Sequence, residues 1–220
     1  MQPSPLSKSD FLAALEAHRI VAAFRKVPVD RIAPTVRALY DGGIRLLEIT
    51  FDQSSTACIA DTQKSIEIAK SLGLPGLMVG AGTVLTAKQA DAAYQAGAGY
   101  LLAPNTDARV MEAANAHQMA SLPGAFTPSE IVEAYSMGAA CVKVFPADNV
   151  GPSYIKAIRS PISHIPMLAM GGVNAENLKA YLAAGVTGVG VGSNIVNLGK
   201  INAGNFEFIT QQAKAYTSQL

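Results

Sequence analysis

Residues 40–50 read YDGGIRLLEIT, and this order of a glycine pair and then an apolar run decides the fold. Glycine at the end of a helical segment supplies the left-handed residue that ends a helix, and the apolar run behind it is typical of a buried strand. The same pattern returns in QAGAGYLLAPN (95–105), SMGAACVKVFP (136–146) and AAGVTGVGVGS (183–193). Helix, glycine and strand in this order form one half of a βαβ unit.

Weaker candidates fill the intervals between these four stretches. Further strands are predicted over residues 20–24, 77–81, 117–123 and 165–170. Amphipathic segments predict helices, some with capping residues such as Thr127 before Pro128, and Asn174 before Glu176 and Asn177. The predicted helices cover 8–18, 30–41, 55–72, 86–96, 107–116, 128–137, 152–159, 174–184 and 204–218.

Eight strands that alternate with eight helices, with one helix before the first strand, predict an α/β fold of the (β/α)₈ TIM-barrel type with an extra N-terminal helix. No linker interrupts the alternation, so residues 1–220 are expected to form a single domain. A doubly wound open sheet is the competing fold, because alternation alone does not distinguish a closed sheet from an open one.

Composition narrows the class of protein. The chain is 50% hydrophobic and 15% charged, which is typical of a globular protein with a sizeable core. The net charge of +1, the scattered Lys and Arg, and the absence of Trp argue against a nucleic-acid partner. The opening MQPSPLSKSD lacks the apolar core of a secretory signal, and no apolar run approaches the length of a membrane span. We therefore expect a cytoplasmic protein with no membrane partner.

Neither a metal site nor a dinucleotide cofactor is predicted. Cys58 and Cys141 are isolated thiols, and His18, His117 and His164 are spread along the chain without metal-ligand spacing. VGAGTV and GVGVGS do not complete the dinucleotide-binding pattern G-x-G-x-x-G. We expect surface or hydrogen-bonded histidines and no cofactor.

Polar residues, glycine and proline gather where the predicted strands end, which is where a barrel of this type carries its active site. In strand order these residues are Arg25, Glu48 and Thr50, Gly82 and Thr83, Pro104 and Asn105, Pro123 and Gly124, Lys143, Gly171 and Gly172, and Gly192 and Ser193.

Lys143 and Glu48 are the two charges inside otherwise apolar strands, in CVKVF and LLEIT. A structural ion pair is one interpretation, although buried pairs often add little net stability. The other is catalytic: burial disfavours the ammonium form, so an interior lysine can be an uncharged nucleophile near neutral pH. Such an amine condenses with a ketone to give a Schiff base that weakens a neighbouring C–C bond, and Glu48 can move the protons. The pair therefore indicates class I aldolase chemistry, which requires no metal.

The glycine turns after the last two strands indicate a phosphate site. In AMGGVNAENL, Gly171 and Gly172 expose backbone N–H groups just before a predicted helix start, and GVGVGS adds the hydroxyl of Ser193. The loops after strands 7 and 8 form the usual phosphate site of these barrels. The alternative is that these glycines only permit tight turns.

The stretches IVAAFR, GGIRLLEIT, VGAGTVL, APN, PGAFTPSE, VKVFPAD, GGVNAENL and GVGVGS, taken together from about Ile20 to Val196, resemble one family. It is that of the 2-keto-3-deoxy-6-phosphogluconate (KDPG) aldolases, also called 4-hydroxy-2-oxoglutarate (KHG) aldolases. The resemblance implies a trimeric (β/α)₈ barrel whose small-molecule partners are a phosphorylated keto acid, which it cleaves, and the products pyruvate and glyceraldehyde 3-phosphate.

The resemblance also implies roles for individual residues. Lys143 becomes the Schiff-base lysine, Glu48 the general acid and base, and Thr83 the residue that holds the pyruvate carboxylate. The remaining implied positions are substrate contacts: Pro104 and Phe145 line the pocket, Gly171, Gly172 and Ser193 bind phosphate, and Arg25 lies near the anionic substrate.

Two positions depart from the family pattern. Asp52 stands four residues after Glu48, where many relatives carry an arginine that grips the carboxylate, and Met170 stands where gluconate-type enzymes often carry a threonine. With the APN version of the strand 4 motif, Met170 favours the galactonate epimer as an alternative substrate. Phosphate-free 4-hydroxy-2-oxoglutarate is a third substrate, and a catalytically silent barrel that binds a sugar phosphate is the alternative outside enzymes.

Overall fold

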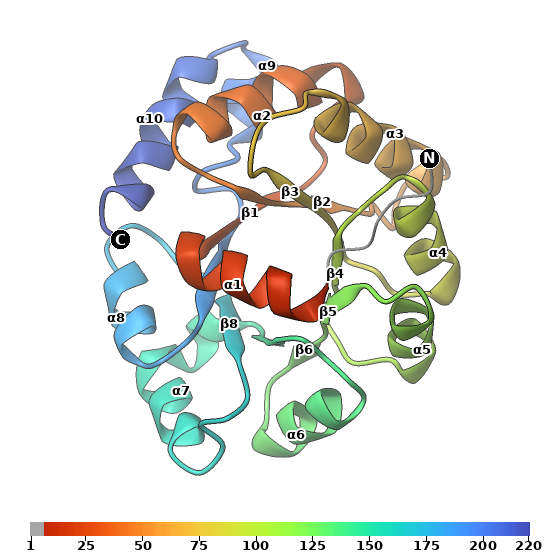
Figure 1. Ribbon diagram of the computed structural model, residues 1–220. Helices are drawn as coiled ribbons and strands as arrows, with labels where there is room; N and C mark the ends of the chain where they lie inside the picture. Colours follow the sequence, from red (N-terminus) through yellow and green to blue (C-terminus); the bar gives the residue numbers. More distant parts are fainter. Residues whose placement is uncertain (1–6) are drawn as a thin grey trace.

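The computed structural model describes residues 7–220. Its parallel strands form a barrel, and helices surround the strands (Figure 1). The strands are β1 (Ile20–Phe24), β2 (Leu46–Thr50), β3 (Met78–Gly82), β4 (Tyr100–Leu102), β5 (Ala120–Leu122), β6 (Gly124–Ala125), β7 (Val142–Val144), β8 (Met167–Met170) and β9 (Gly188–Val191). The helices are α1 (Lys8–His18), α2 (Ile32–Asp41), α3 (Cys58–Ser71), α4 (Ala87–Gln95), α5 (Ala108–Ala116), α6 (Pro128–Ser136), α7 (Gly151–Arg159), α8 (Leu178–Ala183), α9 (Leu198–Asn202) and α10 (Phe206–Thr217), with short 3₁₀ turns η1 (Val29–Arg31) and η2 (Ala147–Asn149).

The sheet closes into a barrel. Its nine strands run in the order β5-β4-β3-β2-β1-β9-β8-β7-β6, and every pair is parallel. The strands β5 and β6 occupy one strand position of the barrel. They are separated at Pro123, which has no N–H to donate. The carbonyl of Pro123 still accepts from the backbone N–H of Lys143 at 2.9 Å. The predicted barrel with its extra N-terminal helix is therefore confirmed over an open sheet.

One predicted helix start is confirmed and another is wrong. Thr127 caps α6 through a capping box with Glu130, and Pro128 is the first helical residue. The predicted helix at Asn174 begins only at Leu178. The Asn174 side chain accepts hydrogen bonds from the backbone of Glu176 and Asn177 at 2.9 and 3.0 Å, so these residues form a turn before the helix.

The barrel interior takes alternate residues from each strand, as the strand period of two requires. Val21 and Ala23 on β1 pack in an interior cluster with Leu46 on β2, whereas Ala22 and Leu47 pack outward against the helices. Glu48 is two residues after Leu46, and Lys143 is two residues after the interior Cys141. Both charged side chains therefore point into the barrel.

Helix α1 covers the amino-terminal end of the barrel. Phe11 and Leu15 are fully buried, and the Phe11 ring lies 4.7 Å from the ring of Tyr100 inside the barrel. Figure 1 looks onto this end, with α1 crossing in front of the strands. The open end is therefore the opposite one, where the strands finish and the βα loops begin.

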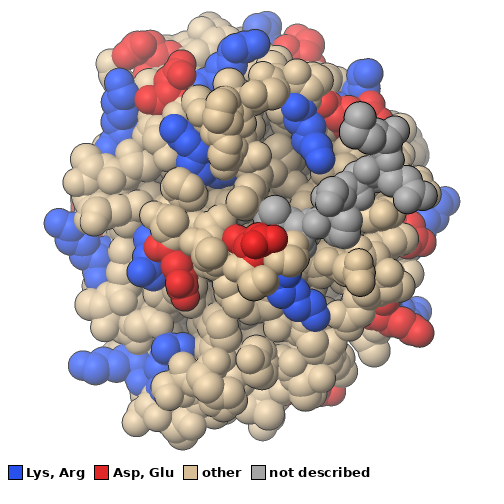
Figure 2. Space-filling view, viewed as in Figure 1, with Lys and Arg blue, Asp and Glu red and all other residues tan. Residues whose placement is uncertain are grey.

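The surface at the α1 end carries mixed charge. Figure 2 shows Lys and Arg interspersed with Asp and Glu on this face, without a basic stripe. Part of the opening sequence MQPSPLSKSD, residues 1–6, lies outside the described residues. Within residues 7–220, every helix is too short or too polar to cross a bilayer.

Candidate active site

Lys143 is held inside the barrel by its strand. Its backbone pairs with Gly124 on β6 and Leu168 on β8, and its neighbours Val142 and Val144 point outward into the helix layer. The residue is 2% exposed. Its ammonium group has no hydrogen bond and no ion pair within 4.0 Å among the described residues. An amine in this position is desolvated and unpaired.

Glu48 lies on β2, which is four strand positions from β7 in either direction around the barrel. Glu48 is therefore on the wall opposite Lys143. It is 1% exposed, and its Oε2 atom has no hydrogen-bond partner in the described part of the chain. A Cβ atom on Gly82 would overlap the Glu48 carboxylate, so glycine at that position makes room for it. The buried acceptor is free to take a proton or a hydrogen bond from a bound molecule.

Electrostatics favours the neutral amine. Burial is the largest effect and lowers the pKa of Lys143 below its ordinary value, the Glu48 carboxylate opposes this shift, and the Arg25 guanidinium adds to it. Burial raises the pKa of the Tyr100 hydroxyl, and the Glu48 carboxylate adds to this rise. The Tyr100 hydroxyl donates to the Leu47 carbonyl at 2.7 Å. Glu48 therefore acts on both groups inside the barrel.

A cavity of about 410 Å³ opens at the carboxyl end of the barrel. We call it the mouth cavity. It brings together five of the predicted site residues, and its wall includes Arg25, Phe145, Gly171, Gly172 and Ser193, with Met170 and Asp148. The substrate contacts predicted from strands 1, 6, 7 and 8 thus share one space.

Phe145 connects the lysine to that space. Its ring is half-buried, and its centroid lies 4.8 Å from Nζ of Lys143. The ring also lines a second cavity of about 320 Å³, the side cavity, together with Pro104, Asn105 and Gly124. Lys143 and Glu48 are not part of either cavity wall, and Phe145 is the residue that lines both cavities and also lies beside Lys143.

The glycine turn after β8 differs from the prediction. Gly171 and Gly172 have positive φ angles of 102° and 66°, which glycine adopts without strain. The helix that was expected directly behind them starts only at Leu178, and α8 has six residues. The turn therefore offers backbone N–H groups but no helix N-terminus. A Cβ atom on Gly172 would overlap the side chain of Asp148, which packs against the turn.

Thr83 follows β3 and does not line either cavity. It is half-buried and has a φ angle of 55°, an unusual value for a β-branched residue. Its carbonyl accepts a hydrogen bond from Nε2 of Gln53 at 2.8 Å. Its hydroxyl makes no hydrogen bond within residues 7–220, so it is available to a ligand.

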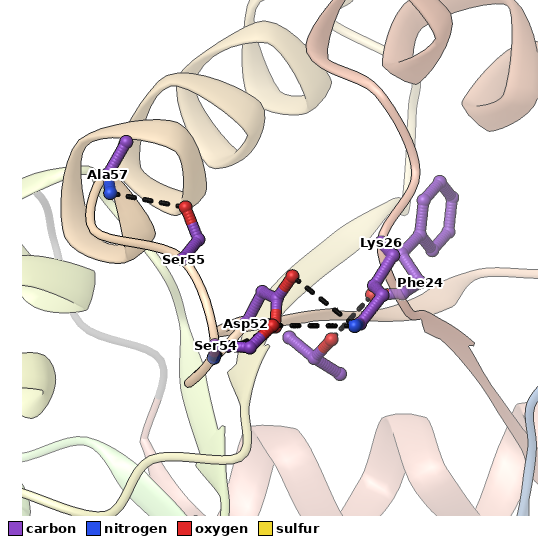
Figure 3. Close-up of polar contacts among 7 residues, drawn as sticks. Phe24, Lys26, Asp52, Ser54, Ser55 and Ala57 are labelled. Atoms are coloured by element: carbon purple, nitrogen blue, oxygen red, sulfur yellow. Dashed lines mark hydrogen bonds and ion pairs between the residues drawn. The ribbon is translucent and has the colours of Figure 1, made fainter.

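Asp52 is turned toward Lys26 and its own loop (Figure 3). Its carboxylate lies 3.7 Å from Nζ of Lys26 and accepts from the hydroxyl and the backbone N–H of Ser54 at 2.6 and 3.1 Å. These hydrogen bonds, with Lys26, lower the pKa of Asp52. Asp52 and Lys26 line a cavity of about 200 Å³ beside Cys58, which has no residue in common with the mouth cavity.

Sequence reasoning missed three side chains near the site. Asp148 ends the stretch VKVFPAD, so its place in the mouth cavity could have been expected from its closeness to Lys143 in the sequence. Gln53 and Gln89 form a hydrogen-bonded link beside Thr83, and nothing in their spacing marked them.

The histidines and cysteines have structural surroundings. His117, at the end of α5, lies 2.7 Å from Asp91 and stacks on Tyr94, which gives it a carboxylate partner that the sequence did not predict. Cys141 is buried and Cys58 half-buried, and both thiols are free. In the described residues, no three His, Cys, Asp or Glu side chains lie close enough together to hold a metal ion.

Fold and site describe a parallel α/β barrel whose interior carries a lysine and a glutamate below an open, glycine-lined mouth. A family model for the KDPG and KHG aldolases matches residues 12–212. A probable 2-dehydro-3-deoxy-6-phosphogalactonate aldolase from Rhizobium meliloti is 33% identical, over 82% of each chain. The KHG/KDPG aldolase of Escherichia coli K12 is 33% identical, over 84% of each chain. The protein belongs to the KDPG and KHG aldolase family.

Solved structures agree with this assignment. The KDPG aldolase of Zymomonas mobilis ZM4 with 3-phosphoglycerate superposes with a TM-score of 0.84 at 27% identity, covering 96% of this chain and 97% of the other. A native KDPGal structure superposes with a TM-score of 0.80 at 32% identity, covering 91% and 96%. The barrel is thus that of the aldolases in this family.

Proposed function

We propose that this protein is a class I aldolase that cleaves 2-keto-3-deoxy-6-phosphogluconate to pyruvate and glyceraldehyde 3-phosphate through a Schiff base on Lys143. The observation that carries the proposal is the buried, unpaired amine of Lys143, whose pKa burial lowers, with the Glu48 carboxylate on the opposite wall. An uncharged amine attacks a ketone, whereas an ammonium group does not.

In the proposed reaction, Nζ of Lys143 attacks the C2 carbonyl, and the carbinolamine loses water to give the iminium ion. Removal of the C4 hydroxyl proton lets the C3–C4 bond break. Its electron pair moves into the iminium system to give an enamine, and glyceraldehyde 3-phosphate leaves as the aldehyde. Protonation of C3 and hydrolysis of the imine then release pyruvate and the free amine.

Glu48 is the proposed acid and base for these proton transfers, acting directly or through one water molecule. Its free Oε2 atom and its place opposite Lys143 support this role. Glu48→Gln keeps the size of the side chain and removes the titrating group. We expect this variant to form the imine and to turn over about 10²- to 10⁴-fold more slowly, the usual cost of a lost acid or base.

The proposal is tested by comparing steady-state cleavage with imine trapping in Glu48→Gln. Normal turnover in this variant would exclude Glu48 from the proton transfers. Release of pyruvate by the wild-type protein should also persist in EDTA. Loss of activity that is restored by an added divalent metal would contradict a lysine-based mechanism.

The phosphate end of the substrate is assigned to the mouth cavity. Backbone N–H groups at the Gly171–Gly172 turn and near Ser193 are suitable donors for a phosphate group, and Arg25 supplies positive charge on the same wall. A phosphate-free substrate such as 4-hydroxy-2-oxoglutarate would leave these groups without a partner. We therefore expect higher kcat/KM for the phosphorylated substrate.

The second candidate substrate is the galactonate epimer, 2-keto-3-deoxy-6-phosphogalactonate. Met170 lines the mouth cavity and offers no hydroxyl to the substrate. Relatives named as 2-dehydro-3-deoxy-6-phosphogalactonate aldolases, where dehydro and keto denote the same group, are 33% and 32% identical to this chain. Relatives named for the gluconate substrate have similar identity. Steady-state rates on the two purified epimers distinguish the candidates, because both substrates yield the same products.

We also propose that the active protein is a homotrimer. The proposal rests on family resemblance, and one solved structure similar to this chain is a protein cage made by fusing symmetric oligomeric domains. Light scattering after size exclusion measures the mass directly. A mass of one chain of 22.9 kDa in fully active protein would contradict the trimer.

A further inference from the structure

The carboxylate end of the proposed site has an unusual construction in this chain. Asp52 occupies the position at which relatives carry a carboxylate-binding arginine, and its own carboxylate is held by Lys26 and Ser54 (Figure 3). The next residue, Gln53, instead reaches the loop after β3. The loop after β2 thus presents the neutral amide of Gln53, and no cation, to the loop after β3.

Gln53 is part of a short hydrogen-bonded chain between two βα loops. Its Nε2 donates to the Thr83 carbonyl at 2.8 Å, and its Oε1 accepts from Nε2 of Gln89 at 2.9 Å. Oε1 of Gln89 in turn accepts from the backbone N–H of Leu85 at 2.8 Å. Gln89 is only 6% exposed, so its amide is fixed by its surroundings and in turn orients Gln53.

The segment that Gln53 holds is strained. Thr83 has a φ angle of 55°, and a β-branched residue is strained in this left-handed region of the backbone. Such a conformation persists only where surrounding contacts enforce it. The Gln53 hydrogen bond to the Thr83 carbonyl is one of these contacts, and the Thr83 hydroxyl remains free.

We propose that Gln53 is a positioning residue of the aldolase site: its side-chain amide holds Thr83 in the backbone conformation that presents the Thr83 hydroxyl to the carboxylate of bound pyruvate. This inference rests on the proposed function and deepens it. Gln53 acts on binding of the keto acid and takes no part in the proton transfers.

The test is a pyruvate titration in the presence of borohydride, with the initial rate of adduct formation as the readout. Gln53→Ala removes the hydrogen bond to the Thr83 carbonyl, and Gln53→Met removes it while keeping the bulk of the side chain. We expect the pyruvate concentration at half-maximal rate to rise about 3- to 10-fold in both, which is the effect of one net hydrogen bond. The limiting rate at saturating pyruvate should stay at the wild-type value, because the lost contact affects only binding.

Gln63→Ala is the matched control. Nε2 of Gln63 donates to the carbonyl of Ala92 at 3.1 Å, so this variant also loses an amide–carbonyl hydrogen bond from a glutamine in the α3 region. Gln63 lines neither the mouth nor the side cavity. We expect Gln63→Ala to leave the pyruvate titration unchanged. It should lower the unfolding temperature no more than Gln53→Ala does, because Gln53→Ala also removes the hydrogen bond from Gln89.

A double-mutant cycle shows whether Gln53 acts through Thr83. Thr83→Val removes the hydroxyl and keeps the branched shape. If Gln53 only positions that hydroxyl, Gln53→Ala should have no further effect on the pyruvate titration in the Thr83→Val background. Effects that multiply would overturn the inference.

The outcomes separate the two proposals. A wild-type protein that forms no adduct with pyruvate would contradict the proposed function and this inference with it. In a second outcome, the wild-type protein forms the adduct while Gln53→Ala and Gln53→Met reach half-maximal rate at the wild-type pyruvate concentration. This result would contradict only the role of Gln53. A fall in the limiting rate without a change in half-saturation would also overturn it.

Discussion

Lys143 is the residue on which the proposed chemistry depends, and its protonation should be visible in the pH profile. Burial and the Arg25 guanidinium lower the pKa of Lys143, so the amine loses its proton below the ordinary value of 10.5. The neutral amine is the proposed nucleophile. The rate of adduct formation with pyruvate and borohydride should therefore rise with pH and level off below the pH expected for an ordinary lysine.

Arg25 sets part of that shift. Because the Arg25 charge lowers the pKa of Lys143, Arg25→Met should raise it and move the rising limb of the pH–rate profile to higher pH. Arg37→Met removes an exposed arginine from α2 and should leave the limb in place. A limb at the same pH in Arg25→Met would show that this charge does not act on the amine.

Sequence reasoning was most successful for single residues whose chemistry contradicts their surroundings. Lys143 and Glu48 are predicted as site residues because a charge inside an apolar strand needs an explanation. Both side chains point into the barrel. Gln53 carried no such signal, because a glutamine in a polar loop is ordinary. Its contact with Thr83 depends on the path of the loop, which the Asp52–Ser54 turn determines in three dimensions.

At the scale of secondary structure, the close approach of β2 and β3 is a feature that a single methyl group would disrupt. A Cβ atom on Gly82 would overlap the Glu48 carboxylate, so Gly82→Ala should displace Glu48 and destabilise the fold by about 1–3 kcal/mol through overpacking. Turnover should fall together with stability. Thermal unfolding and steady-state kinetics measure both quantities.

Gly199→Ala is a suitable comparison on helix α9. Among residues 7–220, a Cβ atom there would meet only Asn197, at 3.4 Å, and alanine favours a helix by about 0.5–1 kcal/mol over glycine. This variant should keep its activity and lose no stability. Wild-type kinetics in Gly82→Ala would mean that the Glu48 position is not critical.

The elements themselves were largely predictable, since glycine endings and apolar runs determine them locally. Two errors fell where a side chain competes with the helix or where the backbone lacks a donor, and α9 was not among the predicted helices. Asn174 forms a turn, so α8 begins later in the sequence than predicted. Pro123 separates β5 from β6. The Gly171–Gly172 turn, which is the proposed phosphate site, therefore lacks the helix N-terminus that the sequence suggested.

At the scale of the whole molecule, α1 closes one end of the barrel and the site lies at the other. Phe11 is fully buried against Tyr100, so Phe11→Ala should lower the free energy of unfolding by about 3–5 kcal/mol. The folded variant should retain the pyruvate titration of the wild type at low temperature, because the cavity walls are untouched. Denaturant unfolding and the titration measure the two effects separately.

Val132→Ala provides the reference for Phe11→Ala. Val132 is 46% exposed on α6, and its truncation should change stability by less than about 0.5 kcal/mol. Equal losses in the two variants would show that α1 does not stabilise the barrel. A large change in pyruvate half-saturation in Phe11→Ala would show instead that the two ends of the barrel are coupled.

Closure of the barrel could not be deduced from alternation alone, since an open sheet has the same order of elements. The closure depends on pairing between β6 and β7, which brings the β7 lysine opposite the β2 glutamate. The site therefore exists only in the closed molecule.

The most direct test of the central claim is mass spectrometry of the protein after treatment with pyruvate and borohydride. The wild-type chain should gain one reduced pyruvate adduct, located on the peptide that contains Lys143, and Lys143→Ala should gain none. An unmodified wild-type chain, or an adduct on another lysine, would contradict Schiff-base catalysis by Lys143.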